Sequence, residues 1–410
     1  MTRRRTVAAT AAVLAGALVL AGCGTNRTES GGAAGGSCDT SKGTLVIGMI
    51  APLSGGLSAL GLGMRNSADL AVKQANEQCT VPGYRLAFQP EDDQATPQVA
   101  NQAATKLASD PNVVGVVGTL NSSTAQTVQP ILAGKNIVMV SPANTNPTLT
   151  LGPDPANPTR PFPNYFRVAT TDLIQGPFAA QYLVKTAGKK NIAVIDDGKT
   201  YGAQLAAEFA KQAQKDGATI VAQEKVGEKD TDFSGVIATI KPLNPDAVYY
   251  GGEFPQAGPL SAQLAANGLP VPLMGGDGIY DAKFIELGGR PGDLATSVGA
   301  PAESLASAKA FIDAYNAAGY TEPFSAYGVF TYDSANVIID ALAKTVASGE
   351  WSDASRATLI ENVGKTDLAG ASGPLKFDEF GDTTNKVLTV YTVKDGEWSP
   401  VEGSTGSFQG

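Results

Sequence analysis

Short apolar runs alternate with stretches of helical periodicity along most of this chain. The first run, residues 45–50, is continuously apolar, which is typical of a parallel strand covered by helices on both faces. Four rounds of strand and helix precede residue 141 and predict a doubly wound sheet. The expected strands are residues 45–50, 86–89, 113–117 and 137–140, and the expected helices lie around 64–75, at 97–109 and from 122 onward.

Residues 141–164 are rich in Pro, Asn and Thr, and we expect them to be irregular. The alternation then resumes, with helices expected at 174–186, 203–215, 233–240 and 256–267 and strands at 192–195, 219–222, 247–250 and 273–274. The predicted fold class is therefore α/β, with two doubly wound, Rossmann-like lobes. Ligands of open α/β sheets bind outside the carboxyl ends of the strands, so we expect a ligand cleft between the lobes.

The N-terminus has the features of an export signal. Three arginines at positions 3–5 precede an apolar segment, residues 7–20, that is too short to span a bilayer comfortably. The sequence LAGC at 20–23 follows and resembles the lipobox of bacterial lipoproteins, in which cleavage exposes a cysteine that receives a diacylglyceryl group. This resemblance implies lipidation of Cys23.

The first 43 residues therefore divide into two expected segments. Residues 1–22 are expected to be a lipoprotein signal peptide, and residues 23–43, rich in Gly and Ser, a flexible tether. A plain secretory signal, in which Cys23 is incidental, is the alternative.

Composition excludes several classes of function. The formal net charge is −9 and becomes −12 without the three leader arginines, which argues against nucleic acid or an anionic membrane surface as a partner. The chain contains no histidine, which excludes a Ser-His-Asp triad, a Cys-His dyad and a His-ligated zinc. We expect no metal, no cofactor and no catalytic residues.

Cys38 and Cys79 are the two cysteines left if Cys23 is acylated. In an oxidising compartment such a pair predicts a disulfide, and two unpaired thiols are the alternative.

Eight short motifs occur in an order that resembles the leucine/isoleucine/valine-binding proteins of ABC importers. They are APLSG at 51–55, GTLNSST at 118–124, SPANTNP at 141–147, KTYG at 199–202, GEKD at 227–230, YYGG at 249–252, GGDG at 275–278 and GPLKFD at 373–378. The resemblance covers Leu45 to Trp398 and implies the type I periplasmic-binding fold. It places one lobe at 44–166 plus about 299–372 and the other at 167–298 plus about 373–400.

The resemblance also implies a ligand site for an α-amino acid. Ser122 and Thr145 would bind the ligand carboxylate, Asp277 its ammonium, and the ring of Tyr201 would pack near the α-carbon and amine. Each has an ordinary alternative: Ser122 as a helix cap, Thr145 and Asp277 as turn residues, and Tyr201 as a half-buried ring at a helix start. The other expected ligand-binding residues are Ala143, Phe254 and Leu60.

The chain departs from the pattern of this family at several of these positions. Asn144 and Asn121 replace small residues, and Glu253 with Phe254 replaces a pair of aromatics, so that one pocket wall is expected to be acidic. Leu60 replaces a large aromatic residue, which enlarges the pocket or makes it more aliphatic. These departures concern the ligand side chain and not the amino-acid head group.

The function that we expect is that of a lipid-anchored, extracytoplasmic substrate-binding protein of an ABC importer. It would bind a small amino acid, branched-chain or otherwise apolar, as a monomer, and deliver it to a permease driven by an ATPase. One alternative is a sensor, or a binder of amides or urea, with the same fold. Another is an extracellular hydrolase that uses a carboxylate pair.

Overall fold

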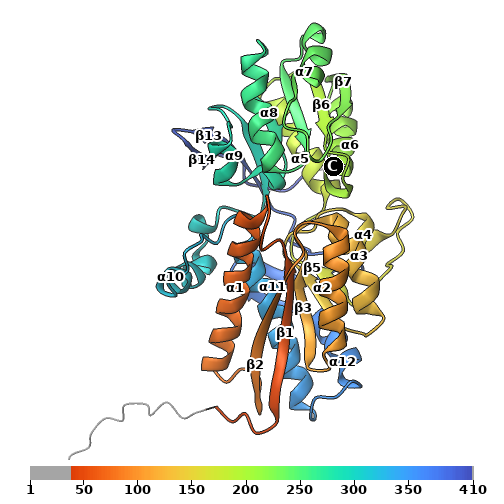
Figure 1. Ribbon diagram of the computed structural model, residues 1–410, viewed down its shortest axis with the longest axis vertical. Coiled ribbons are helices and arrows are strands. Elements are labelled where there is room, and N and C mark those ends of the chain that lie inside the picture. The colour runs from red at the N-terminus through yellow and green to blue at the C-terminus, as the bar shows by residue number, and fades with distance from the viewer. Residues whose placement is uncertain (1–37, 409–410) are drawn as a thin grey trace, which may run out of the picture. The chain divides into compact units, whose positions relative to one another are not determined.

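The computed structural model describes residues 38–408, which contain two large sheets (Figure 1). The first sheet is parallel throughout and has the strand order β2-β1-β3-β4-β5. Its strands are β1 (Gly43–Ala51), β2 (Tyr84–Asp92), β3 (Val113–Gly118), β4 (Val138–Ser141) and β5 (Tyr165–Arg167). We call this sheet and the helices packed on it the first lobe.

Helices cover both faces of this sheet, which is why its central strands are continuously apolar. Every residue of β1 from Leu45 onward is buried, as is every residue of β3. One face is covered by α1 (Ser58–Glu77), α11 (Gly328–Ala347) and α12 (Ser355–Gly364), and the other by α2 (Pro97–Ser109) and α3 (Ser122–Ala133).

The second sheet has the strand order β14-β13-β10-β9-β8-β6-β7. Five strands are parallel, and β13 and β14 join antiparallel at one edge. The strands are β6 (Asn191–Asp196), β7 (Thr219–Lys225), β8 (Ala247–Gly251), β9 (Leu273–Gly275), β10 (Leu294–Val298), β13 (Leu388–Lys394) and β14 (Glu397–Pro400). This sheet with its helices is the second lobe.

Two apolar clusters cover the faces of the second sheet. The first contains side chains of α5 (Asp172–Gln181), the π-helical turn η1 (Tyr182–Thr186) and α6 (Thr200–Lys215). The second contains side chains of α7 (Ser234–Ile240), α8 (Phe254–Ala266) and α9 (Ala282–Glu286). Two 3-10 turns, η2 (Lys241–Leu243) and η3 (Asp277–Ile279), lie within this lobe, and a third, η4 (Ala302–Ser304), follows β10.

The chain passes between the two lobes three times. The first passage follows β5, the second follows β10, and the third precedes β13. Between the second and third passages lie η5 (Ala306–Ala308), α10 (Lys309–Ala317), α11, α12 and the small sheet of β11 (Asp367–Gly370) with β12 (Gly373–Lys376). The lobe limits stated above remain a prediction.

The predicted α/β fold class is confirmed, with two local differences. Residues 141–164 contain a short helix, α4 (Thr148–Leu151), which begins where the Asn146 side chain accepts hydrogen bonds from the backbone N–H and the hydroxyl of Thr148. The expectation of a wholly irregular segment was therefore wrong. The helix expected at 174–186 begins at Asp172 and changes to π-helical hydrogen bonding at Tyr182.

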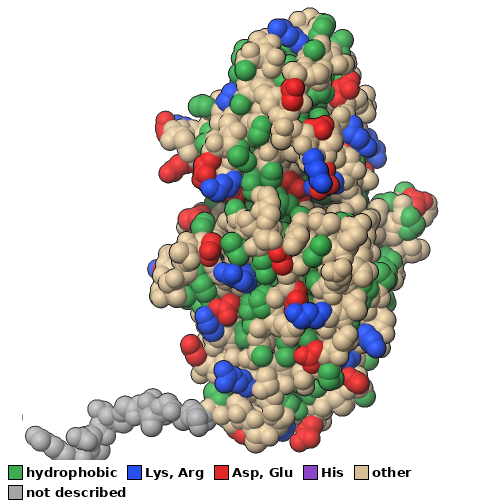
Figure 2. All heavy atoms as spheres, viewed as in Figure 1, with side chains coloured by type: hydrophobic (Ala, Val, Ile, Leu, Met, Phe, Trp, Pro, Cys, Tyr) green, Lys and Arg blue, Asp and Glu red, His purple; other side chains and the backbone are tan. Residues whose placement is uncertain are grey.

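The signal peptide, Cys23 and the tether up to residue 37 lie outside the described residues. Within residues 38–408, no helix has both the length and the apolar character needed to cross a membrane. On the face shown in Figure 2, acidic and basic side chains are interspersed.

A disulfide joins Cys38 to Cys79, just beyond the end of α1, with 5.4 Å between the Cα atoms. It links the segment before β1 to the body of the first lobe.

In a Cys23→Ser background, thiol titration of the denatured, unreduced protein should therefore find no free thiol. Replacing both cysteines by Ser should lower the free energy of unfolding by about 3–4 kcal/mol, because the bond closes a loop of about forty residues in the unfolded chain. Two free thiols would contradict the pairing.

Candidate functional site

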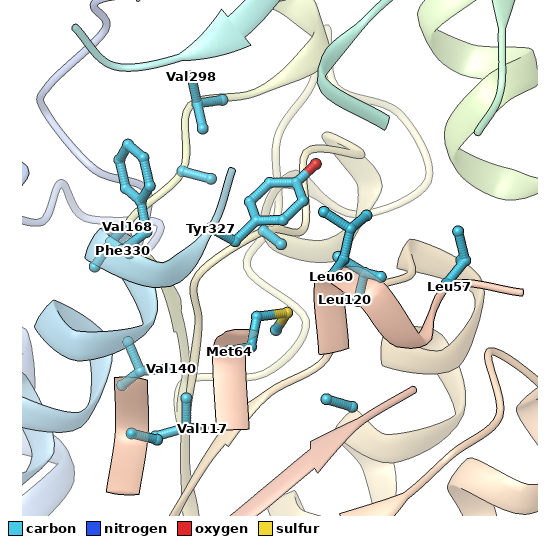
Figure 3. Packing of buried hydrophobic residues seen from close by; sticks show 14 of the residues in the cluster. Leu57, Leu60, Met64, Val117, Leu120, Val140, Val168, Val298, Tyr327 and Phe330 are labelled. Carbon is cyan, nitrogen blue, oxygen red and sulfur yellow. The ribbon is translucent and has the colours of Figure 1, made fainter. Parts of the chain in front are cut away.

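A small cavity lies between the two lobes, beside the carboxyl ends of the strands. Both lobes contribute to its wall, as expected for an open α/β sheet. The lining residues are Leu57, Leu60, Leu120, Asn121, Ser122, Ala143 and Tyr327 from the first lobe and Tyr201, Glu253, Asp277 and Gly278 from the second. Figure 3 shows Leu60 and Tyr327 side by side, with the Tyr327 hydroxyl directed away from Met64.

The turn between β3 and α3 forms part of this wall. Gly118 ends β3 with φ +135°, and a Cβ there would collide with the carbonyl oxygen of Ile50, so only glycine fits. Asn121 occupies the N-cap position of α3, and Ser122 is the first helical residue. The first N–H groups of a helix have no partner within it, which makes this end of α3 suitable for a carboxylate.

Three side-chain hydrogen bonds fix the carboxylate of Asp277 in the site. Its side chain is buried, and Oδ1 accepts hydrogen bonds from the Tyr201 hydroxyl at 2.8 Å and from Gln175 Nε2 at 2.9 Å. Oδ2 accepts one from the Tyr327 hydroxyl at 2.8 Å. Burial raises the pKa of Asp277, and these three neutral donors oppose the rise by stabilising the ionised form. A ligand cation would complete this arrangement.

The glycine before Asp277 is required by packing. Gly276 has φ −85°, so backbone strain does not select it. A Cβ at Gly276 would collide with the Tyr201 hydroxyl and with Leu205. The close approach of Tyr201 therefore explains a glycine that the sequence alone also allowed as part of an ordinary turn.

The structure brings together five of the seven expected ligand-binding residues. Leu60, Ser122, Ala143, Tyr201 and Asp277 all line the cavity.

Thr145 and Phe254 do not line it. Thr145 is buried next to Asp172, whose backbone N–H donates to the Thr145 carbonyl oxygen at 2.9 Å. Phe254 is the first residue of α8, and its ring is buried in the apolar core of the second lobe. Its neighbour Glu253 lines the cavity in its place.

Two residues that hold Asp277 were not found from the sequence. Gln175, on α5, is itself fixed by a hydrogen bond from the Thr296 hydroxyl at 2.9 Å, and its Oε1 also accepts from the Asp277 backbone N–H. Tyr327 precedes α11, about fifty residues beyond Asp277 in the chain. Neither lies in a recognisable motif, so only the tertiary contact identifies them.

Glu253 contributes a second carboxylate to the wall. It accepts a short hydrogen bond from Asn121 Nδ2 of the first lobe and lies 3.1 Å from Lys199 Nζ. Burial alone would lower the pKa of Lys199, but the negative charges of Glu253, Asp197 and Glu228 outweigh this effect and raise it. Lys199 is therefore held in its charged form. Among residues 38–408, no group of His, Cys, Asp and Glu could hold a metal ion.

Comparison with known proteins places the chain in a family. The sequence model described as "Periplasmic binding protein" matches residues 44–397. The Leu/Ile/Val-binding protein BraC3 of Rhizobium johnstonii is 30% identical over 355 residues, which cover 86% of this chain and 92% of that protein. The leucine-, isoleucine-, valine-, threonine-, and alanine-binding protein of Pseudomonas aeruginosa is 30% identical over 352 residues, which cover 85% of this chain and 89% of that protein.

A solved structure, the leucine binding protein LivK of Thermotoga maritima, has a TM-score of 0.76 and 27% identity and covers 87% of this chain and 97% of that one. The fold and the cavity define a two-lobed binding protein. The chain belongs to the periplasmic binding protein family.

The raised pKa of Asp197, a buried carboxyl near Glu253, predicts that the stability of the protein depends on pH. Burial, and then the charge of Glu253, raise the pKa of Asp197 to about 7, whereas an unfolded Asp titrates near pH 3.9. Between about pH 4 and 7 the folded state therefore binds more protons than the unfolded state, and this carboxyl lowers stability as the pH rises. Urea unfolding at pH 4 and pH 8 should show that Asp197→Asn loses less stability over this range than the parent.

The matched control is Asp232→Asn. Asp232 is exposed, and the backbone N–H and hydroxyl of Ser234 lower its pKa, so this variant should alter the pH dependence of stability only below about pH 4 and leave the loss between pH 4 and 8 as in the parent. If Asp197→Asn and the parent lose the same stability between pH 4 and 8, Asp197 is ionised throughout.

Proposed function

We propose that this protein is the extracytoplasmic substrate-binding component of an ABC importer and that its ligand is a small α-amino acid. The observation that carries this proposal is the pairing of opposite polarities in one cavity. The second lobe supplies the Asp277 carboxylate, held by neutral donors, and the first lobe supplies the N-terminus of α3 at Ser122. A zwitterion matches both.

The apolar part of the wall supports an aliphatic side chain. Leu57, Leu60 and Leu120 lie together on the first lobe and line the cavity. Two relatives described above are named for binding leucine, isoleucine and valine, and one of them also for threonine and alanine. Branched-chain and similarly small amino acids are therefore the first candidates.

The partners follow from the proposed class. The ligand would be released to a membrane permease driven by an ATPase, with no bond broken and no cofactor required. Acylation of Cys23 would hold the protein on the outer face of the cell membrane as a monomer. A binder of amides or urea, or a sensor, is the alternative that the same fold allows.

Asp277 provides the decisive test. Removing one partner of a buried charge pair costs about 2–5 kcal/mol of binding free energy, whereas losing one hydroxyl that binds a carboxylate costs about 1.5–3 kcal/mol. Calorimetry with the best amino acid from a screen of the twenty should therefore show a larger loss for Asp277→Asn than for Ser122→Ala.

Asp281→Asn is the control, because Asp281 caps α9 outside the cavity and Asn can cap equally well. Binding by Asp277→Asn as tight as by the parent would overturn the ammonium site. A neutral ligand, such as an amide, would then replace the amino acid as the better assignment.

The anchor has an independent test. Cys23→Ser removes the acylation site, and the protein should move from the membrane fraction to the soluble extracytoplasmic fraction. Stable anchoring requires more than one acyl chain, and all of them depend on the modified cysteine in this class of lipoprotein. Unchanged membrane partitioning of the variant, measured by fractionation and immunoblotting, would contradict the proposal.

A further inference from the structure

The cavity wall contains a second carboxylate that an ammonium group at Asp277 does not use. Glu253 immediately precedes α8, at the carboxyl end of β8, and is only 9% exposed although it lines the cavity. BraC3 is named for binding leucine, isoleucine and valine, whose aliphatic side chains have no evident use for a carboxylate in the wall. Its position therefore bears on the chemistry of the ligand side chain.

The present partners of Glu253 leave part of its capacity to accept hydrogen bonds unused. Oε1 accepts from Asn121 Nδ2, and Oε2 accepts from Lys199 Nζ at 3.1 Å. A carboxylate offers about four acceptor positions on its two oxygens. Two positions therefore remain, and the cavity is the place from which a bound molecule can reach them.

The charges around Glu253 restrict the group that would bind there. Lys199 pairs with Glu253 as well as with Glu228, so Glu253 has a cationic partner before any ligand binds. An anionic side chain would meet two carboxylates, Glu253 and Asp277, in one small cavity. A neutral donor, a hydroxyl or an amide N–H, is the group that gains a hydrogen bond at the least electrostatic cost.

We propose that Glu253 is a specificity-determining residue, which selects small α-amino acids with a neutral hydrogen-bond donor in the side chain over aliphatic amino acids of the same shape. The proposal rests on the proposed function and narrows its ligand. Threonine and valine are one such pair of equal shape, and asparagine and leucine are a close second pair.

The apolar part of the cavity wall allows the affinities of the two amino acids in each pair to be compared directly. Leu57, Leu60 and Leu120 would contact the carbon atoms that both members of a pair share, so the difference in affinity reports the group by which the two members differ. A hydrogen bond to a charged group is worth enough to give a preference of about tenfold or more. We do not expect a larger ratio of affinities, because Glu253 keeps Asn121 and Lys199 as partners even when an aliphatic ligand binds.

The experiment compares Kd for threonine and valine, and for asparagine and leucine, by calorimetry on the full chain. The parent should bind the donor member of each pair about tenfold or more tightly. Glu253→Leu should abolish or reverse the preference, and Glu253→Gln, which keeps the shape but not the charge, should reduce it several-fold. Glu286→Gln is the matched control, because Glu286 also pairs with a lysine but is exposed on α9, so the preference should be unchanged.

Two results would overturn the inference. Valine and leucine binding as tightly as threonine and asparagine would remove the specificity role but leave an amino-acid-binding function intact. A preference that persists unchanged in Glu253→Gln and Glu253→Leu would assign it to another residue. Failure of all twenty amino acids to bind the parent would instead overturn the proposed function together with this inference.

Discussion

The buried carboxylate of Asp277 is the interaction on which the rest of the site depends. A carboxylate out of water is stable only where donors replace its hydration, and here Gln175, Tyr201 and Tyr327 do so from three separate elements. Because Tyr327 belongs to the first lobe and Asp277 to the second, satisfying this carboxylate also joins the lobes beside the cavity. The same set of hydrogen bonds therefore stabilises the buried carboxylate and holds the two lobes in contact.

Other contacts between the lobes surround the same cavity. Asn121 of the first lobe donates to Glu253 of the second, and Asn146 Nδ2 donates to the Thr200 carbonyl oxygen at 2.8 Å. These bonds use side chains that follow β3, β4 and β8 and a backbone carbonyl group that follows β6. Since the carboxyl ends of parallel strands collect the segments that follow them at one edge of each sheet, the two lobes face one another through their most polar segments. The apolar leucines of α1 and the β3–α3 turn supply the remainder of the wall.

The loop after β4 depends on a buried ion pair. Arg167 is fully buried and lies 2.6 Å from Asp382. Its remaining donors reach the carbonyl oxygens of Asn144 and Asn146 and the hydroxyl of Thr150. Removing either member of such a pair would leave an uncompensated buried charge, which is strongly unfavourable. The guanidinium therefore fixes a loop that composition alone describes as irregular, and it connects that loop to the third passage between the lobes.

The sequence by itself determined the elements and the fold class, because burial of a parallel strand on both faces requires an apolar run such as residues 45–50 and each covering helix requires one apolar face. The resemblance of its motifs to a known family also named Ser122, Tyr201 and Asp277 as ligand-binding residues. The tertiary structure alone decided that Tyr327 and Gln175 hold Asp277, that Glu253 rather than Phe254 lines the cavity, and that Thr145 lies beside Asp172. These outcomes depend on contacts between elements that are far apart in the sequence, such as that of Gln175 with Asp277, 102 residues away, which no local pattern of side chains records.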